Sequence, residues 1–309
     1  MLEFLAPVEH FGHRFDRGSI LFEFDALREP ERTQFPIIGA YLRARGVEFN
    51  EVPTPQMLWR GKLWPDLYIA NQLDAAEGAH PMLRDDMSCH AKYKAHWSDT
   101  FTLEEASSLN HGGAFHVAFI EPLCRKIAGR SSAEIAAKYH RAIWIPLYWP
   151  QTLRARQSIA TPFYYPRAGY AGAAIPGDAG AGRPSSDVAS RPADAVDAIE
   201  LSTAFALAVP RQRFSVAFIV DDSPIYRVTD QEECAGGPTR PLLHRLIVEY
   251  RGECDVHDEM ARLGFVDRIE KIAYGSARLQ LPTLSNVAAG WTPRPHINAQ
   301  LWSIINDET

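Results

Sequence analysis

The chain has 309 residues, of which 46% are hydrophobic and 23% charged, so it is long enough to bury a large core and to form two domains or one large domain with insertions. A net charge of -6 and a pI near 6.0 argue against nucleic acid as a main partner, because phosphate binding needs a concentrated excess of Lys and Arg. The sequence has no apolar run long enough to cross a membrane, so no membrane association is expected.

The N-terminus and the cysteines indicate a reduced, cytoplasmic protein. The segment MLEFLAPVEHFGHRF lacks the basic region and apolar core of a signal peptide. The four cysteines are scattered without CxxC spacing, and Cys124 falls on the apolar face of an expected helix, where a small core residue is the simplest interpretation.

The first hundred residues are expected to hold short elements. MLWRGKLWPDLYI, residues 57–69, has two short apolar runs around Arg60-Gly61-Lys62, which is typical of a hairpin with Gly in the tight turn. The other elements expected here are an extended region over 1–25 with a polar turn in HRFDRGS and a strand in ILFEF, a helix between Pro36 and Gly46, a short helix over 71–78, and an irregular connection over 79–102.

A helical hairpin over about 103–150 is the strongest pattern in the sequence. From His116 to Ile127, apolar residues recur every three or four positions, which predicts one face of a helix that ends at Gly129. Ser131 or Ser132 is expected to cap a second helix that runs towards Pro146. WIPLYWP then follows, and so much aromatic surface either wedges two layers together or lines a pocket.

The second half is expected to be rich in strands. Gly, Ala, Pro and Ser dominate from Gly169 to Ala195, which predicts a long loop or linker. The elements expected after it are strands in RFSVAFIVDD, IYRVTDQ and HRLIVEYRG, a short helix in DEMARLGF ended by Gly264, and a last strand in ARLQLPTL. This order predicts an α+β or α/β fold, in which a mixed sheet carries a helical insert. The expected division is 1–70, 71–160 and 161–309.

Several catalytic motifs are absent from the sequence. It has no HExxH, GxSxG or GxxxxGK[ST], and no GxGxxG follows a strand, so the zinc hydrolase, α/β-hydrolase, P-loop and dinucleotide-cradle interpretations have no support. His111 and His116 are spaced wrongly for two ligands of one ion on a helix, and DVHDE at 255–259 is read as a solvated turn. No metal site is therefore expected.

Three segments carry positive signals, each with a plain alternative. FDRGS places a glycine beside a strand, PFYYPRAGYAG gathers three tyrosines and an arginine around two prolines, and YRVT sets Arg227 within an apolar strand. The alternatives are a turn, a packed loop and a strand residue that reaches solvent.

In order along the chain, these segments resemble motifs of the FAD-dependent superfamily that includes UDP-galactopyranose mutase, protoporphyrinogen oxidase and the flavin amine oxidases. GHRFDRGSILFEF resembles the strand and turn against the flavin ring, MLWRGKLWPDLYI the hairpin that opens the substrate part, and FIEPLCRKIAG a helix of the family. PFYYPRAGYAG resembles its turn into the substrate floor, IYRVTDQE its Arg-(Ile/Val)-Thr strand, and INAQLWSIINDET its Asn-Asp turn before the last flavin-binding helix.

The resemblance departs from the family at both ends. Met1 falls where the glycine-rich βαβ unit should already have ended, and Thr309 falls where the last flavin-binding helix should begin. The resemblance therefore implies a flavoenzyme with an incomplete Rossmann module. Either a partner chain supplies that module and FAD is shared between the chains, or flavin binding is lost and the pocket serves another purpose.

The resemblance also implies site residues. Those expected to face the cofactor are Asp16, Arg17, Gly18, Ser19, Asn306 and Asp307. Those expected to contact substrate or line its pocket are Arg60, Trp144, Tyr148, Trp149, Tyr164, Tyr165 and Arg227. Arginine suits a carboxylate or phosphate because it donates two parallel hydrogen bonds. The sequence singles out no general base.

Three functions stay open at this point. The first is the substrate-binding subunit of a split FAD-dependent oxidoreductase, in which a hydride passes from a small substrate to the flavin. The second is a non-catalytic subunit that stabilises a flavoprotein. The third is a stand-alone α+β enzyme that works without flavin.

Overall fold

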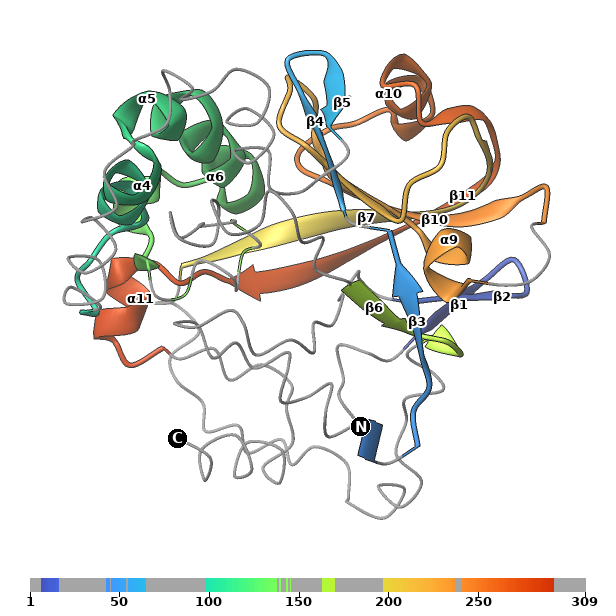
Figure 1. Cartoon of the computed structure of the whole chain (residues 1–309), viewed down its shortest axis with the longest axis horizontal. Coiled ribbons are helices and arrows are strands. Elements are labelled where there is room, and N and C mark those ends of the chain that lie inside the picture. Colours follow the sequence, from blue (N-terminus) through green and yellow to red (C-terminus); the bar gives the residue numbers. More distant parts are fainter. Residues whose placement is uncertain are drawn as a thin grey trace.

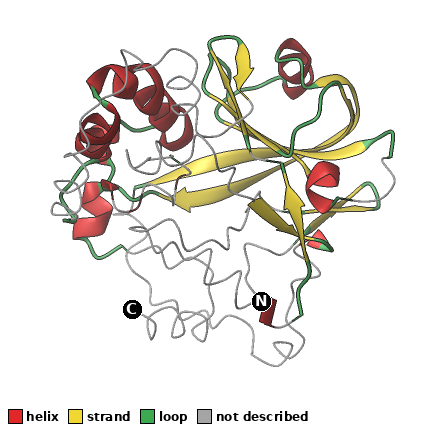
Figure 2. Ribbon diagram, viewed as in Figure 1, coloured by secondary structure: helices red, strands yellow, loops and turns green. Residues whose placement is uncertain are grey.

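A computed structural model describes residues 7–16, 43–44, 46–53, 55–64, 98–137, 139, 143, 145, 163–169, 197–236 and 241–291. Figure 1 and Figure 2 show a large twisted sheet with helices gathered at one end and a group of short strands beneath the other. The fold is mixed α+β, as the sequence predicts.

The main sheet has seven strands in the order β11-β7-β10-β9-β8-β4-β5. All neighbours run antiparallel except β4 and β8, which run parallel. Its strands are β4 (Gln56–Trp59), β5 (Lys62–Trp64), β7 (Ala198–Pro210), β8 (Val216–Ile219), β9 (Ile225–Asp230), β10 (His244–Tyr250) and β11 (Val266–Gln280). The ribbon of β7 and β11 is the longest feature of the sheet (Figure 2).

Helices cover one end of the sheet (Figure 1). The elements there are α4 (Leu103–His111), α5 (Gly113–Phe115), the π-helical turn η2 (His116–Ile120), α6 (Glu121–Ala128), the 3-10 turn η3 (Ser132–Glu134) and α11 (Leu284–Ala288). The stretch from Gly113 to Ala128 is one continuous helix of 16 residues. Phe115 and Phe119 stack on each other and pack edge-on against Trp59 of β4, which joins the helices to the sheet.

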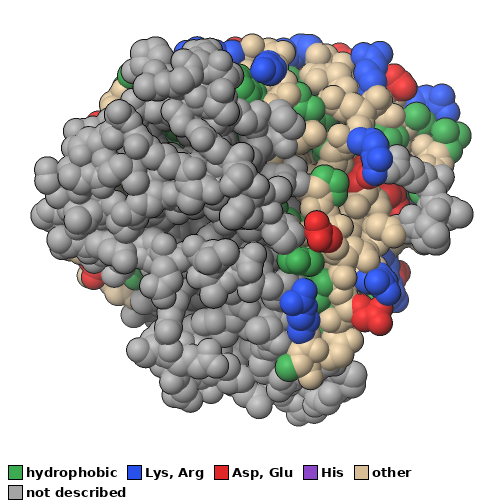
Figure 3. Space-filling view, in the orientation of Figure 1, with side chains coloured by type: hydrophobic (Ala, Val, Ile, Leu, Met, Phe, Trp, Pro, Cys, Tyr) green, Lys and Arg blue, Asp and Glu red, His purple; other side chains and the backbone are tan. Residues whose placement is uncertain are grey.

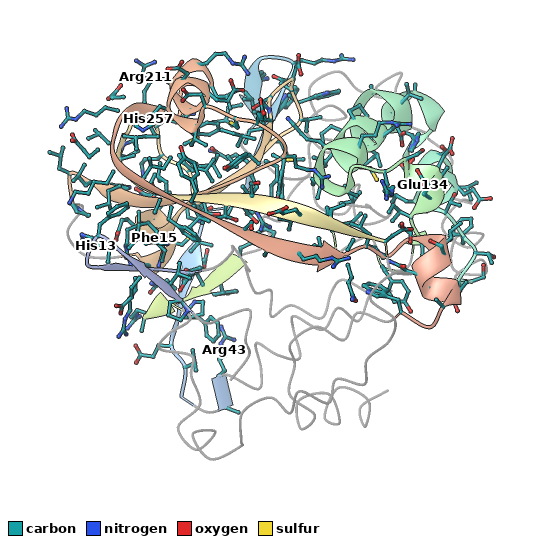
Figure 4. The ribbon with its side chains drawn as sticks, turned by 180° about the vertical axis from the view of Figure 1, so that it is seen from behind. His13, Phe15, Arg43, Glu134, Arg211 and His257 are labelled. Carbon is teal, nitrogen blue, oxygen red and sulfur yellow. The ribbon has the colours of Figure 1, made fainter. Side chains whose placement is uncertain are left out.

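Two small sheets and two short helices complete the described fold. These are β1 (Val8–His10) paired with β2 (His13–Phe15), β3 (Phe49–Val52) paired with β6 (Phe163–Pro166), and the helices α9 (Gln231–Ala235) and α10 (Val256–Arg262). Phe15 of β2, labelled in Figure 4, is buried against Phe205 of β7 and Ile247 of β10. The β1–β2 hairpin is therefore packed on the same sheet that the helices cover at the other end.

Several sequence predictions are confirmed. The turn at Arg60 and Gly61 has positive φ at both residues and joins β4 to β5, as the Gly-containing hairpin pattern predicts. The 16-residue helix ends at Gly129 in the left-handed conformation. Strands β8, β9 and β10 lie within their predicted segments, and Cys124 is a buried core residue.

The second helix predicted after Ser131 does not form at its expected start, and residues 138, 140–142 and 144 of the predicted range lie outside the described residues. The expected capping box forms between Ser131 and Glu134, but the helical turn stops there because Ile135 is extended. Ile135 bridges to Thr283, and the amide of Ala136 donates to the carbonyl oxygen of Pro282 at 2.8 Å. This backbone pairing with the segment before α11 stabilises an extended chain where the cap alone favours a helix.

The sequence predictions missed or misplaced several other elements. Strand β7 was not predicted, and β11 was predicted only at its C-terminal end, in ARLQLPTL. The segment 255–259 is the start of helix α10, capped by Asp255, and not a solvated turn. Residues 13–15 of the expected polar turn HRFDRGS form strand β2. The strand in ILFEF and the helix over 71–78 lie outside the described residues, as does the Gly169–Ala195 loop beyond its first residue.

No helix among the described residues is long and apolar enough to cross a membrane. On the face shown in Figure 3, basic and acidic side chains are interspersed over the described part of the surface. This distribution agrees with the sequence, which has no block of one charge.

Candidate functional site

The inner face of the main sheet carries a row of residues that lie side by side across five strands. Cα pairing places Met57, Phe218, Arg227, Glu249 and Thr203 next to one another, on β4, β8, β9, β10 and β7. Paired residues of neighbouring strands share a face of the sheet. Met57 and Phe218 belong to the core formed with the helices, so this row faces the helical end.

A buried ion pair occupies the centre of this row. Arg227 and Glu249 are only 4% and 6% exposed, and the guanidinium makes a two-pronged contact with the carboxylate through Nε–Oε2 and through Nη2–Oε1 at 2.6 Å. The Arg227 Cζ atom lies 6.0 Å from the centroid of the Phe218 ring. Taking two charges out of water costs several kcal/mol per ion, so a pair in mid-sheet calls for a reason other than stability.

A β-bulge next to the pair redirects one more side chain. Glu249 pairs with Arg227, but the next residue, Tyr250, pairs with Ile225, so Tyr226 has no partner across the ladder. Strict alternation would place Tyr226 with Val228 on the opposite face. Tyr226 instead packs with Phe218 in the core beneath the helices. Bulges often lie beside functional sites because they re-aim a side chain in this way.

A second buried contact joins two residues that the motif resemblance assigns to different roles. The Tyr165 hydroxyl on β6 donates to the Asp16 carboxylate just after β2, and both residues are at least 98% buried. Gly169 lies close by, where an added Cβ would be 3.3 Å from Asp16 Oδ2, and its φ of +65° already disfavours any side chain. The structure therefore brings the expected cofactor-side and substrate-side residues together.

Helix α9 holds Asp16 in place. The amide of Asp16 donates to Gln231 Oε1 at 3.2 Å, and Gln231 Nε2 lies 3.5 Å from the carbonyl oxygen of Arg14. Arg245 Nη1 donates to the same carbonyl at 2.6 Å, while its Nε binds Glu232. The end of β2 is thus fixed by side chains from α9 and β10.

The cap of α9 contains a buried carboxylate–imidazole pair that the sequence did not suggest. The Asp230 carboxylate accepts hydrogen bonds from the amides of Glu232 and Glu233 through Oδ1 and contacts His244 Nδ1 at 2.7 Å through Oδ2. The hydrogen bond with Asp230 raises the pKa of His244 above its ordinary value, while burial raises the pKa of Asp230. This pair stabilises the helix that positions Asp16.

Replacing His244 with Gln is expected to cost stability in a pH-dependent way. Because the pKa of His244 is raised in the folded state, its contribution is complete below the unfolded value of 6.5 and is lost as pH rises through the folded pKa. Urea unfolding of wild type and His244→Gln across this range measures the difference, which should shrink as pH rises. The exposed His257 on α10, labelled in Figure 4, provides the control variant His257→Gln. A difference that stays constant with pH would contradict the assignment.

The other expected site residues fall in different places. Arg60 lies at the exposed tip of the β4–β5 hairpin, 4.5 Å from the Trp59 ring centroid, and its amide and that of Gly61 donate to the Asp221 carboxylate. Tyr164 is half-buried beneath the Arg43 guanidinium, which Figure 4 labels. Arg17, Gly18, Ser19, Trp144, Tyr148, Trp149, Asn306 and Asp307 lie outside the described residues.

Glu249 is the residue of this site that sequence reasoning missed. Its strand reads HRLIVEYRG, with one acidic residue among apolar ones, and Arg227 stands in the same isolation in IYRVTD. Two lone opposite charges in two buried strands were a usable signal for a cross-strand pair. The alternative interpretation of Arg227, as a strand residue that reaches solvent, is wrong.

His116 and Cys124, which lie in the helices, are buried and serve as structural residues. His116 is buried with Nε2 3.3 Å from Ser132 Oγ and 4.0 Å from Glu121, and burial lowers its pKa. Burial raises the pKa of the Cys124 thiol to about 12, which makes it a poor nucleophile. The described part of the chain holds no cluster of metal-ligating side chains.

Comparison with known proteins finds similarity at the level of structure. No protein-family model matches the chain, and no curated protein matches it by sequence. A reduced UDP-galactopyranose mutase matches over 99% of this chain and 79% of its own, at 10% identity and a TM-score of 0.54. A protein of Pyrococcus furiosus and an oxidoreductase of Methanosarcina mazei each match over 90% of this chain and 80% of their own, at 11% and 10% identity and TM-scores of 0.52. The fold is thus similar, across most of the chain, to that of UDP-galactopyranose mutase, as the order of the motifs predicts.

Proposed function

We propose that this chain is the substrate-binding subunit of a FAD-dependent oxidoreductase whose dinucleotide-binding module is contributed by a partner chain. The observation that carries the proposal is the match of fold to UDP-galactopyranose mutase over 99% of this chain. The buried Asp16–Tyr165 contact supports it, because the two residues come from motifs that resemble the flavin-facing and substrate-facing parts of that superfamily.

The described residues fit the substrate role better than the dinucleotide role. A dinucleotide cradle needs a strand, a glycine-rich turn and a helix, followed by a parallel strand. Within the described ranges, β4 and β8 are the single parallel pair, and the chain between them passes through the helical layer and β6 and β7. The described residues therefore do not form a pyrophosphate cradle.

The chain's own residues would bind and orient the substrate. FAD in the assembled enzyme supplies the hydride acceptor. Asp16 and Tyr165 form a fixed polar contact at one side. The floor of the proposed site would be Phe218, Tyr226 and the Arg227–Glu249 pair, whose charges cancel and which lies buried on the sheet face beneath the helices. An anionic substrate would have to compete with Glu249 for Arg227, so this floor favours a neutral or cationic group.

Co-expression with candidate chains that carry GxGxxG tests the assembly. The expected result is a yellow complex with the absorbance of oxidised flavin, whose colour is bleached by a substrate from a panel of amines, alcohols and sugars under anaerobic conditions. Tyr165→Phe keeps the buried ring and removes the hydroxyl, so it should keep the yellow complex and slow bleaching by roughly tenfold or more. Tyr274→Phe, at an exposed position on β11, is the matched control.

The outcomes separate the remaining possibilities. A chain that stays colourless and binds no candidate module contradicts the split enzyme. A yellow complex in which Tyr165→Phe bleaches at the wild-type rate contradicts the site and favours the stabilising subunit. Turnover by the purified chain in the absence of flavin would favour a stand-alone enzyme.

A further inference from the structure

Among the described residues, β11 is a long strand at the edge of the main sheet. It has 15 residues and, within the described part of the chain, pairs along one side with β7. Tyr274, Gly275, Ser276 and Ala277 are all exposed. Because successive side chains point to opposite faces of a sheet, four consecutive exposed residues mean that both faces are uncovered here. The free edge presents backbone donors and acceptors to another strand.

The two halves of β11 differ in their suitability for pairing. The first half carries alternating charges and two register shifts against β7, one before Arg268 and one before Lys271. Charges and bulges are features that protect an edge strand from pairing. From Lys271 to Gln280 the ladder is regular, and the six residues from Ile272 to Ala277 bear no charge. The second half is therefore the part open to a further strand.

We propose that a second copy of this chain pairs with β11, antiparallel and with Tyr274 on the two-fold axis. A two-fold axis perpendicular to a sheet keeps every residue on its own face of the sheet. One residue must therefore lie directly opposite its own copy, and the axis passes between the two. With Tyr274 on the axis, Ile272 lies opposite Ser276 and Ala273 lies opposite Gly275 of the second copy. The larger side chains of one half then meet the smaller ones of the other.

Charge supports this register. It places Arg278 of one copy opposite Glu270 of the other, and Lys271 opposite Ala277. Moving the axis by one residue, to Ala273, would set Arg268 opposite Arg278, and like charges directly across a ladder are destabilising. A hollow of about 270 Å³ lies over the ladder between β7 and the second half of β11. Its lining residues are Ala198, Ile199, Glu200, Ser276, Ala277 and Arg278.

Introducing a charge at Tyr274, the residue that would face its own copy, tests both the proposed interface and the register of the two strands. Sedimentation of the full chain over a wide concentration range should show a monomer–dimer equilibrium. Tyr274→Lys or Tyr274→Glu places two like charges across the axis and should raise the dissociation constant by about tenfold or more. A mixture of the two variants should restore a one-to-one dimer, because Lys then faces Glu. Leu242→Lys, at a residue that is 70% exposed before β10, is the control.

Cross-linking gives a second measurement that does not depend on the charged variants. Residues directly opposite in an antiparallel pair have Cα atoms about 4.5–5.5 Å apart, which suits a disulfide. Oxidised Tyr274→Cys should run as a dimer on a non-reducing gel, and oxidised Leu242→Cys should not. A wild-type chain that is monomeric at every concentration overturns the proposal, as does a dimer that is insensitive to Tyr274→Lys and is not cross-linked through Tyr274→Cys.

Discussion

Replacing Arg227 with Met is expected to lower the free energy of unfolding by about 3–5 kcal/mol. Glu249 is almost fully buried and makes its two-pronged contact with Arg227, so the variant leaves a carboxylate in the sheet without its cation. Urea unfolding at neutral pH measures the loss. Glu249→Leu should lower the free energy of unfolding by a similar amount, because it leaves the buried Arg227 guanidinium without the Glu249 carboxylate.

The double variant Arg227→Met/Glu249→Leu distinguishes the pair from simple packing. Replacing both charges with apolar groups removes the desolvation cost together with the attraction, so the double variant should regain most of the stability lost in either single variant. Arg211 and Asp267 form an exposed pair at 3.0 Å and provide the control, since Arg211→Met should change stability by less than about 1 kcal/mol. Losses that simply add in the double variant would contradict an ion pair that acts as a unit.

A stable but inactive double variant would also bear on function. If the assembled enzyme forms, binds flavin and loses turnover, then the charges serve the substrate site and not the fold. Retained turnover would instead assign the pair a structural role. The stability cycle and the activity assay therefore answer different questions about the same two residues.

Local patterns predicted those parts of the fold that local chemistry determines. The hairpin at Arg60 and Gly61 forms because the turn needs positive φ at both central residues, and Gly supplies one of them at no cost. The helix that ends at Gly129 follows from apolar spacing and a left-handed cap. Tertiary pairing overrode the cap at Ser131, since Ile135 bonds to a segment almost 150 residues away.

The long ribbon and the buried pairs depended on information that local patterns do not carry. Strand β11 begins VDRIEK, which reads as polar and irregular because an edge strand has solvent on several sides. The Asp16–Tyr165 contact joins residues 149 positions apart, and only the resemblance to a family suggested that both belong to a site. His244 and Asp230 were missed because neither forms a motif in sequence.

A change of pH is expected to reveal a half-buried charge at the junction of the helices and the sheet. Lys126 of α6 donates to the carbonyl oxygens of Ile219, at 2.9 Å, and Asp221 at the end of β8. Burial lowers the pKa of Lys126 from 10.5 to about 8. Between these values the unfolded chain binds more protons than the folded chain, so the stability contributed by Lys126 rises as pH rises.

The stability of wild type relative to Lys126→Met should therefore increase between about pH 8 and pH 10, by up to roughly 3 kcal/mol. The variant has no titrating group at this position, so the difference isolates Lys126 from other groups that titrate in the same range. Lys271→Met, at an exposed position on β11, is the control variant. A difference between wild type and Lys126→Met that does not change with pH would mean that the Lys126 ammonium is not desolvated. Because Lys126 contacts the end of β8, the strand that carries Phe218, its deprotonation near pH 8 would remove one positive charge from that edge of the proposed site.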